Sequence, residues 1–119
     1  MTIEWGHVKQ PVDIAQAKSY VGRRIKWKTP RYRIACDGFS TEREGIAIWA
    51  LPKGVKPTVC DEIAQAKVSQ CYSMGSSKTG PSQNDRLIIR VERAHARTGE
   101  PLQPLYFAPR LSSIIAREI

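Results

Sequence analysis

Several features that define common protein classes are scarce in this chain of 119 residues. Its three cysteines, Cys36, Cys60 and Cys71, are odd in number and widely spaced, which excludes a disulfide framework and favours free thiols in a reducing cytoplasm. The longest uncharged apolar run, residues 45–51, is far shorter than the ~20 residues of a membrane-spanning helix. The first residues lack the basic and apolar regions of a secretory signal. We therefore expect a cytoplasmic protein with no membrane partner.

Residues that bind metals or carry catalysis are also few. Besides the cysteines there are two histidines, His7 and His95, and no pair of these five residues has the close spacing of a zinc knuckle. Cys71 and His95 lack the flanking sequence of a nucleophilic site. Residues 75–80 contain Gly, Lys and Thr but lack the spacing of a phosphate-binding loop. We expect no metal and no cofactor, and an active site at an oligomer interface is only a third alternative for the function.

Acidic residues are outnumbered, with 11 Asp and Glu against 19 Lys and Arg, and the net charge is +8. The excess is uneven, because residues 1–35 carry eight basic and two acidic side chains. A concentrated positive charge attracts polyanions such as nucleic acid, anionic lipid or an acidic protein surface.

The most informative stretch is residues 22–35, where cations alternate with apolar and aromatic residues. Alternation in a strand from residue 23 to about residue 29 places Ile25 and Trp27 on a buried face, and the cations between them on the opposite, exposed face. Pro30 then bends or ends the strand. Aromatic side chains in such a stretch can stack on bases while cations contact phosphates. A second basic set lies further along the chain, and the combined candidates for nucleic-acid binding are Arg23, Arg24, Lys26, Lys28, Arg31, Tyr32, Arg33, Arg86 and Arg90.

Other segments predict short elements. Residues 12–21 predict a helix that Asp13 caps and Gly22 ends. Residues 58–72 predict the main helix, and residues 73–85, rich in Gly, Ser and Pro, a mobile loop. Strands are predicted at residues 45–51, 86–93 and 105–108, and residues 111–119 fit a short helix slightly better than a strand. In residues 86–93, alternation points Leu87, Ile89 and Val91 inward and Arg86, Ile88, Arg90 and Glu92 outward.

These elements predict one basic α+β domain over residues 1–119, a small strongly bent antiparallel sheet or an SH3-like barrel of four to five strands with one or two helices. The order of residues 22–27 (Gly-Arg-Arg-Ile-Lys-Trp), 43–49 (Arg-Glu-Gly-Ile-Ala-Ile-Trp) and 85–91 (Asp-Arg-Leu-Ile-Ile-Arg-Val) resembles the rhythm of SH3-like barrels. The resemblance is one of pattern and carries no functional residues.

Two functions follow from these patterns. The first is a non-enzymatic module that binds nucleic acid through the basic strand, with an affinity that falls steeply with salt. The second is a protein-interaction module that docks an acidic protein surface or forms a homodimer through its sheet edges, as accessory proteins of phages, plasmids and integrons do.

Overall fold

The computed structural model describes residues 12–28, 42–72 and 79–119, and within them the chain forms one six-stranded mixed sheet with two short α-helices. The α+β class predicted from the sequence is therefore confirmed, but the prediction of four to five antiparallel strands is wrong, because the sheet has six strands and its β3–β5 pair is parallel. The elements, with η for a 3-10 turn, are α1 (Ile14–Tyr20), β1 (Arg24–Lys28), β2 (Arg43–Leu51), η1 (Pro57–Val59), α2 (Asp61–Gln65), η2 (Val68–Gln70), β3 (Cys71–Tyr72), β4 (Arg86–Ala94), β5 (Pro101–Phe107), η3 (Leu111–Ser113) and β6 (Ile115–Glu118).

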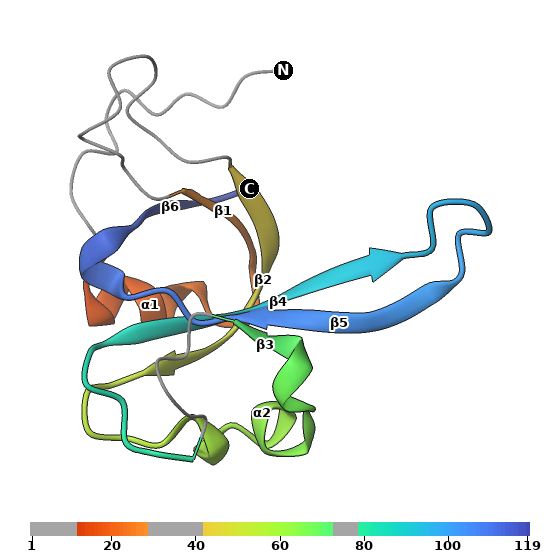
Figure 1. Ribbon diagram of the computed structural model, residues 1–119. Helices are drawn as coiled ribbons and strands as arrows, with labels where there is room; N and C mark the ends of the chain where they lie inside the picture. The colour runs from red at the N-terminus through yellow and green to blue at the C-terminus, as the bar shows by residue number, and fades with distance from the viewer. Residues whose placement is uncertain (1–11, 29–41, 73–78) are drawn as a thin grey trace, which may run out of the picture.

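The strands lie in the order β3-β5-β4-β2-β1-β6, and neighbours are antiparallel except for the short parallel pair β3 and β5. The sheet bends strongly, so that β1 and β6 curl over the face that carries α1 (Figure 1). Among the described residues β3 and β6 are its two edges, so the sheet is open, and closure into an SH3-like barrel is not confirmed. Close contact between β2 and β4 depends on Gly45, where a Cβ would lie 2.7 Å from the carbonyl oxygen of Arg90.

One face of the sheet packs against α1, the helix predicted from residues 12–21. Its N-terminus has a capping box, in which the Asp13 carboxylate accepts a hydrogen bond of 2.8 Å from the backbone N–H of Gln16. Gly22 follows the helix with a φ of +88°, a conformation that favours glycine. The core on this face consists of Val12, Ala17, Ile25, Trp27, Ala47, Leu87, Ile89, Leu111, Ile114 and Ala116.

The opposite face of the sheet carries a second, smaller core, which η1 and α2 cover. Ile88 is completely buried there, although alternation within its strand predicted that it points outward to water. That prediction is wrong because the sheet has a helical layer on both faces, which alternation in a single strand cannot reveal. The members of this core are Leu51, Cys60, Ile63, Ile88, Tyr106 and Ala108.

The helix predicted over residues 58–72 is wrong in its length, since α2 ends at Gln65 and Ala66 is extended (φ −73°, ψ 149°). The next turn, η2, has a backbone bond of 2.9 Å from the N–H of Gln70 to the carbonyl of Lys67, and the Gln70 side chain adds further bonds. The Gln70 amide donates to the carbonyl of Pro104 at 2.9 Å and accepts from the backbone N–H of Lys67 at 3.0 Å. Residues 71 and 72 can then pair with β5 as a strand.

The helix favoured for residues 111–119 is also wrong. After the single turn η3, residues 115–118 form β6 and pair with β1 from Ile25↔Glu118 to Lys28↔Ile115. Without β6, one side of β1 would have no strand to bond to, and this long-range pairing outweighs the weak local preference for a helix.

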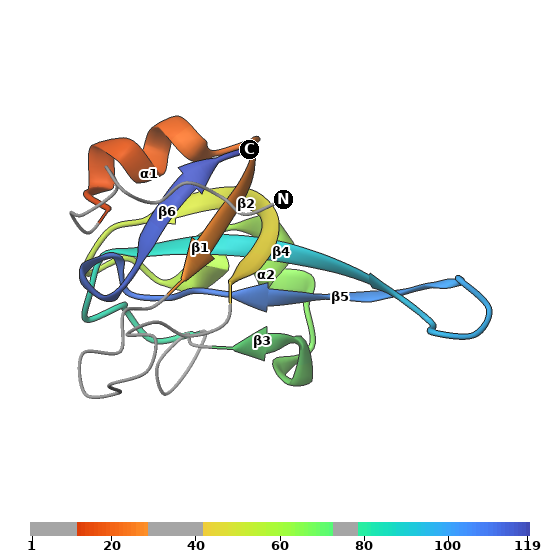
Figure 2. The ribbon, with the colours of Figure 1, turned by 90° about the horizontal axis from the view of Figure 1, so that it is seen from above.

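The ends of β4 and β5 leave the body of the protein as a two-stranded arm, here defined as residues 92–103 (Figures 1 and 2). Every residue of the arm is exposed. At its tip the backbone N–H of His95 donates to the carbonyl of Glu100 at 2.8 Å, and the N–H of Gly99 donates to the carbonyl of His95 at 2.9 Å. Gly99 has a φ of +72°, which this turn requires. The arm is thus a well-formed hairpin with solvent on both faces.

Candidate nucleic-acid interface

Cations from three strands share one face of the sheet. Ile25 and Trp27 of β1 are buried, at 0% and 4% exposure, as alternation predicted, and Arg24 and Lys26 lie on the opposite face. Residues directly opposite one another on neighbouring strands have side chains on the same face. Ile46 of β2 is paired with Arg24 on one side and with Arg90 on the other.

Lys26 is in turn paired with Arg117 of β6. The two basic sets found in the sequence therefore meet on one face through Arg24 and Arg90, and Arg117, which the sequence did not suggest, joins them. We call Arg24, Lys26, Arg90 and Arg117 the basic face.

Carboxylates accompany these cations. Glu44 lies directly opposite Lys26, and its carboxylate is 3.8 Å from a guanidinium nitrogen of Arg24. The Arg24 and Glu44 side chains are 55% and 44% exposed, so water competes strongly with this long contact. Exposed ion pairs of this kind contribute about 0–1 kcal/mol to stability.

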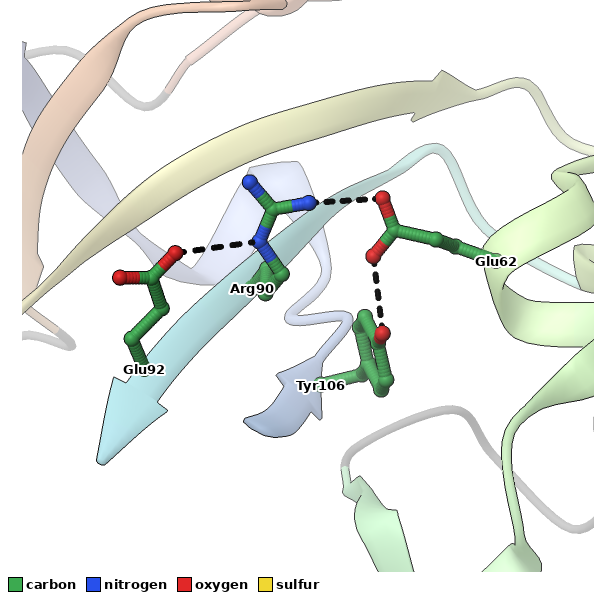
Figure 3. A network of polar contacts seen from close by, with 4 residues as sticks. All are labelled: Glu62, Arg90, Glu92 and Tyr106. Atoms are coloured by element: carbon green, nitrogen blue, oxygen red, sulfur yellow. Dashed lines mark hydrogen bonds and ion pairs between the residues drawn. The ribbon is translucent and has the colours of Figure 1, made fainter. Parts of the chain in front are cut away.

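A tighter network anchors Arg90 of the basic face (Figure 3). One carboxylate oxygen of Glu62, from α2, accepts a hydrogen bond of 2.7 Å from Arg90, and the other accepts one of 2.8 Å from the Tyr106 hydroxyl. Burial, reinforced by the hydrogen bond to Glu62 and by its negative charge, raises the pKa of Tyr106 to about 12. The Arg90 guanidinium is also 3.8 Å from the carboxylate of Glu92. Glu62 thus connects α2 to two strands and fixes the position of the arginine.

Two of the predicted cations are not exposed. Arg86 is 9% exposed, and its guanidinium donates to the carbonyl of Ala108 at 2.7 Å and to the hydroxyl of Ser82 at 3.2 Å. Burial lowers the pKa of Arg86, with a smaller effect from the charge of Arg110. Lys28 is 8% exposed, and its ammonium lies 3.8 Å from Glu42. Both side chains therefore take part in the internal structure of the protein.

The remaining candidates lie near the basic face or outside the described residues. Arg23 precedes β1, is exposed, and forms an ion pair of 2.6 Å with Glu118. The predicted contacts Arg31, Tyr32 and Arg33 lie outside the described residues. Part of the segment predicted as a mobile loop is described, and there Ser82 is buried and its backbone bonds to Gly54 and Val55.

An aromatic group that the sequence did not suggest lies on the opposite face of the sheet. The rings of Tyr72 and Phe107 stack with centroids 5.3 Å apart and planes 20° apart, and the Arg43 guanidinium lies 5.0 Å from the Phe107 centroid. Trp27, which pairs with Arg43 across the strands, also contacts this ring. Tyr72 is 46% exposed. The exposed stacking surface and the basic face therefore belong to different sides of the molecule.

A surface hollow with a volume of about 590 Å³ lies where the arm leaves the body. Its lining residues are Arg90, Glu92, Arg93, Ala94, Pro101, Leu102 and Pro104. Within residues 12–28, 42–72 and 79–119, no group of three or more His, Cys, Asp or Glu side chains is placed to hold a metal ion. No helix in the same ranges has the length and apolar character needed to cross a membrane.

Comparison with known proteins gives no further indication of the function, since no protein family, curated protein or solved structure matches the chain. The fold and the interface define the protein only as an α+β chain with an open mixed sheet.

Proposed function

We propose that the protein binds nucleic acid through the basic face. The observation that carries the proposal is the meeting of Arg24, Lys26, Arg90 and Arg117, from β1, β4 and β6, on one side of the sheet. With neighbouring strands ~4.8 Å apart, β6 to β4 spans about 14 Å, so these cations can contact several phosphates of one backbone.

The nearby carboxylates weaken this face but do not cancel it. The Arg24–Glu44 pair is long and exposed, so a phosphate can replace Glu44 at a cost of about 1 kcal/mol or less. Lys26 has no ion pair among the residues that the structure describes. Arg90 stays bonded to Glu62, which leaves part of its guanidinium to meet a ligand. Arg24 and Lys26 are therefore the residues on which binding depends most.

Fluorescence anisotropy with labelled single-stranded and duplex oligonucleotides tests the proposal at low and at physiological salt. We expect binding that weakens with salt, and a loss of about tenfold or more in the double variant Arg24→Glu, Lys26→Glu. A matched control is Lys53→Glu, Lys56→Glu, which makes the same change in charge at two exposed lysines of the loop between β2 and η1. The control should bind within about twofold of the wild type once non-specific attraction is screened.

Equal losses in both double variants would contradict the proposal, because they would show that net charge alone attracts the oligonucleotide. No oligonucleotide binding at physiological salt would also contradict it and would favour an acidic protein as the partner of the basic face. The slope of log affinity against log salt should fall by about 2 in the double variant Arg24→Ala, Lys26→Ala, since each cation that meets a phosphate releases about one counterion.

A further inference from the structure

Trp49 is an exposed aromatic residue on a central strand of the sheet. It belongs to β2, which lies between β1 and β4, and its side chain is 37% exposed. Trp27 of the neighbouring strand β1 is only 4% exposed. Large aromatic side chains on a central strand are usually covered by another layer of the fold, because their burial contributes strongly to stability. The exposure of Trp49 therefore needs a reason.

An irregularity in β2 determines the side of the sheet on which Trp49 lies. Strict alternation from Ala47, a member of the main core, would place Trp49 toward the same core and α1. The pairing with β4 instead shifts by one residue, since Ala47 is opposite Ile89 and Trp49 is opposite Ile88. Ile48 is the extra residue of this β-bulge. Because a bulge reverses the alternation that follows it, Trp49 leaves the side of the main core.

The residues around the bulge show which side Trp49 joins. Ile88 belongs to the second core, and Arg90 lies two residues further along β4, where the pairing with β2 is regular, so both share one face. Trp49 is directly opposite Ile88 and therefore lies on the same face as Arg90. Beyond the bulge, Leu51 belongs to the second core, as the reversed alternation requires. The indole ring thus shares the side of the basic face.

The spacing of the strands places Trp49 close enough to the cations to meet the same ligand. Two residues of a strand span ~7 Å, and opposite residues of neighbouring strands are ~5 Å apart, so the Cα atoms of Trp49 and Arg90 are about 9 Å apart. Arg24 is opposite Ile46, three residues before Trp49 on β2. The Cα atoms of Arg24 and Trp49 are then about 11 Å apart. Both distances are shorter than the ~14 Å that the basic face spans.

An exposed indole ring beside cations suits a nucleic acid whose bases are unpaired. Every base has a flat π face that can stack on an aromatic ring, and in a duplex the neighbouring base pairs cover these faces. Stacking of this kind tolerates any sequence, while the cations contact the phosphates. Tyr72 is also an exposed aromatic residue, but it lies with Phe107 on the opposite side of the sheet. Trp49 is therefore the described aromatic residue that combines exposure with the side of the basic face.

We propose that the basic face binds single-stranded nucleic acid, with one base stacked on Trp49 and the adjoining phosphates bound by the cations. This inference rests on the proposed binding of nucleic acid and adds the class of ligand and the residue that recognises it. A duplex would meet only the cations. The bulge at Ile48 is then a functional feature, since it turns Trp49 from the main core toward the ligand.

Fluorescence anisotropy with labelled oligothymidine, which forms no duplex, and with a labelled mixed-sequence duplex tests this inference. Trp49→Leu keeps an apolar side chain but has no flat ring, so it should raise the Kd for oligothymidine by about tenfold and leave the Kd for duplex within about twofold. Trp49→Phe keeps a ring and should change the Kd for oligothymidine by about threefold or less. The slope of log affinity against log salt should be unchanged in Trp49→Leu, because an indole ring releases no counterion.

A matched control is Tyr72→Leu, which removes an aromatic side chain of similar exposure, 46% against 37%, from the opposite side of the sheet. It should leave the Kd for oligothymidine within about twofold of the wild type. Circular dichroism establishes that the variants are folded. As a second measurement, unlabelled oligothymidine should quench the tryptophan fluorescence of the wild type, and Trp49→Phe should lose most of that quenching. Unchanged quenching in Trp49→Phe would overturn the inference.

The anisotropy data separate this inference from the proposed function. Oligothymidine binding that depends on Arg24 and Lys26 but is unchanged in folded Trp49→Leu would overturn the inference and leave the proposed function standing. Equal losses of affinity for oligothymidine and duplex in Trp49→Leu would also overturn it, because they would show that Trp49 only supports the structure of the face. The absence of binding to either oligonucleotide at physiological salt would overturn both.

Discussion

Glu62 shows how much one side chain contributes to this fold. It belongs to the first turn of α2, where the helix dipole favours a carboxylate, and it bonds to Arg90 of β4 and Tyr106 of β5. Glu62 therefore adds polar contacts to those of the buried Ile63 in attaching a helix of only five residues to the sheet. Its bond to Arg90 also fixes the guanidinium of that member of the basic face.

Replacement of Tyr106 by phenylalanine removes one of these bonds. We expect the free energy of unfolding at neutral pH to fall by about 1–2 kcal/mol, because the hydroxyl donates to a charged group. The pKa of Tyr106 is raised to about 12 from 10.0, so its contribution is fully present below pH 10 and is lost as the pH rises from 10 to 12. The stability difference between wild type and Tyr106→Phe should thus shrink over that range, as measured by urea denaturation.

The wild type and Tyr106→Phe share every other titrating group. The pH dependence of the difference between their free energies of unfolding therefore reports on Tyr106 alone. A stability difference that stayed constant from pH 8 to 11.5 would contradict the raised pKa. A phenylalanine variant as stable as the wild type at neutral pH would show that the hydroxyl contributes nothing to the attachment of α2.

The sequence predicts the burial of a residue well where that burial depends only on the residue's position in its own strand. Ile25 and Trp27 are buried and Arg24 and Lys26 lie on the other face, because alternation in β1 is a local property. Arg86 could not be predicted in the same way. Its burial depends on Ser82 and Ala108, which the chain brings to it from outside its strand.

At the scale of elements, α1 has the strongest sequence signals and was predicted most closely. Asp13 and Gln16 exchange the two hydrogen bonds of a capping box, and Gly22 ends the helix. The helix covers the main core through Ala17, which is fully buried.

We expect Asp13→Ala to destabilise the protein by about 1 kcal/mol, because a backbone N–H of the first turn loses its acceptor. Asp13→Ser restores an oxygen that can accept the same bond and should recover most of the loss. Thermal denaturation of the three proteins measures the difference. Equal melting temperatures for the alanine and serine variants would show that the carboxylate does not act as a cap.

The elements that the sequence predicted wrongly are those whose state depends on distant strands. Residues 115–118 become a strand because β1 is there to pair with, and residues 71–72 because β5 is. Local preferences differ by a few tenths of a kcal/mol per residue, so one strand pairing outweighs them. The strand order, and with it the face on which Arg24 and Arg90 meet, has no local signal in the sequence.

For the whole molecule, the distribution of charge matters more than its sum. The chain carries +8, yet most cations of the basic face and its surroundings have a carboxylate within 4 Å. The excess charge attracts polyanions at long range, whereas the weak, exposed pairs decide which cations a ligand can recruit. Composition alone predicts the long-range attraction of polyanions. It cannot predict which cations a ligand can recruit, because that depends on the pairing of individual side chains.

The pairing of β1 with β6 governs how fast the sheet can form. Ile25 is bonded in register with Glu118, so the chain must close a loop of nearly its whole described length before the sheet is complete. Folds rich in such distant pairings fold in about milliseconds to seconds. Stopped-flow refolding followed by tryptophan fluorescence should fall in this range, since the buried Trp27 belongs to β1. During synthesis on a ribosome, β1 would wait for its second neighbour until residues 115–118 have emerged.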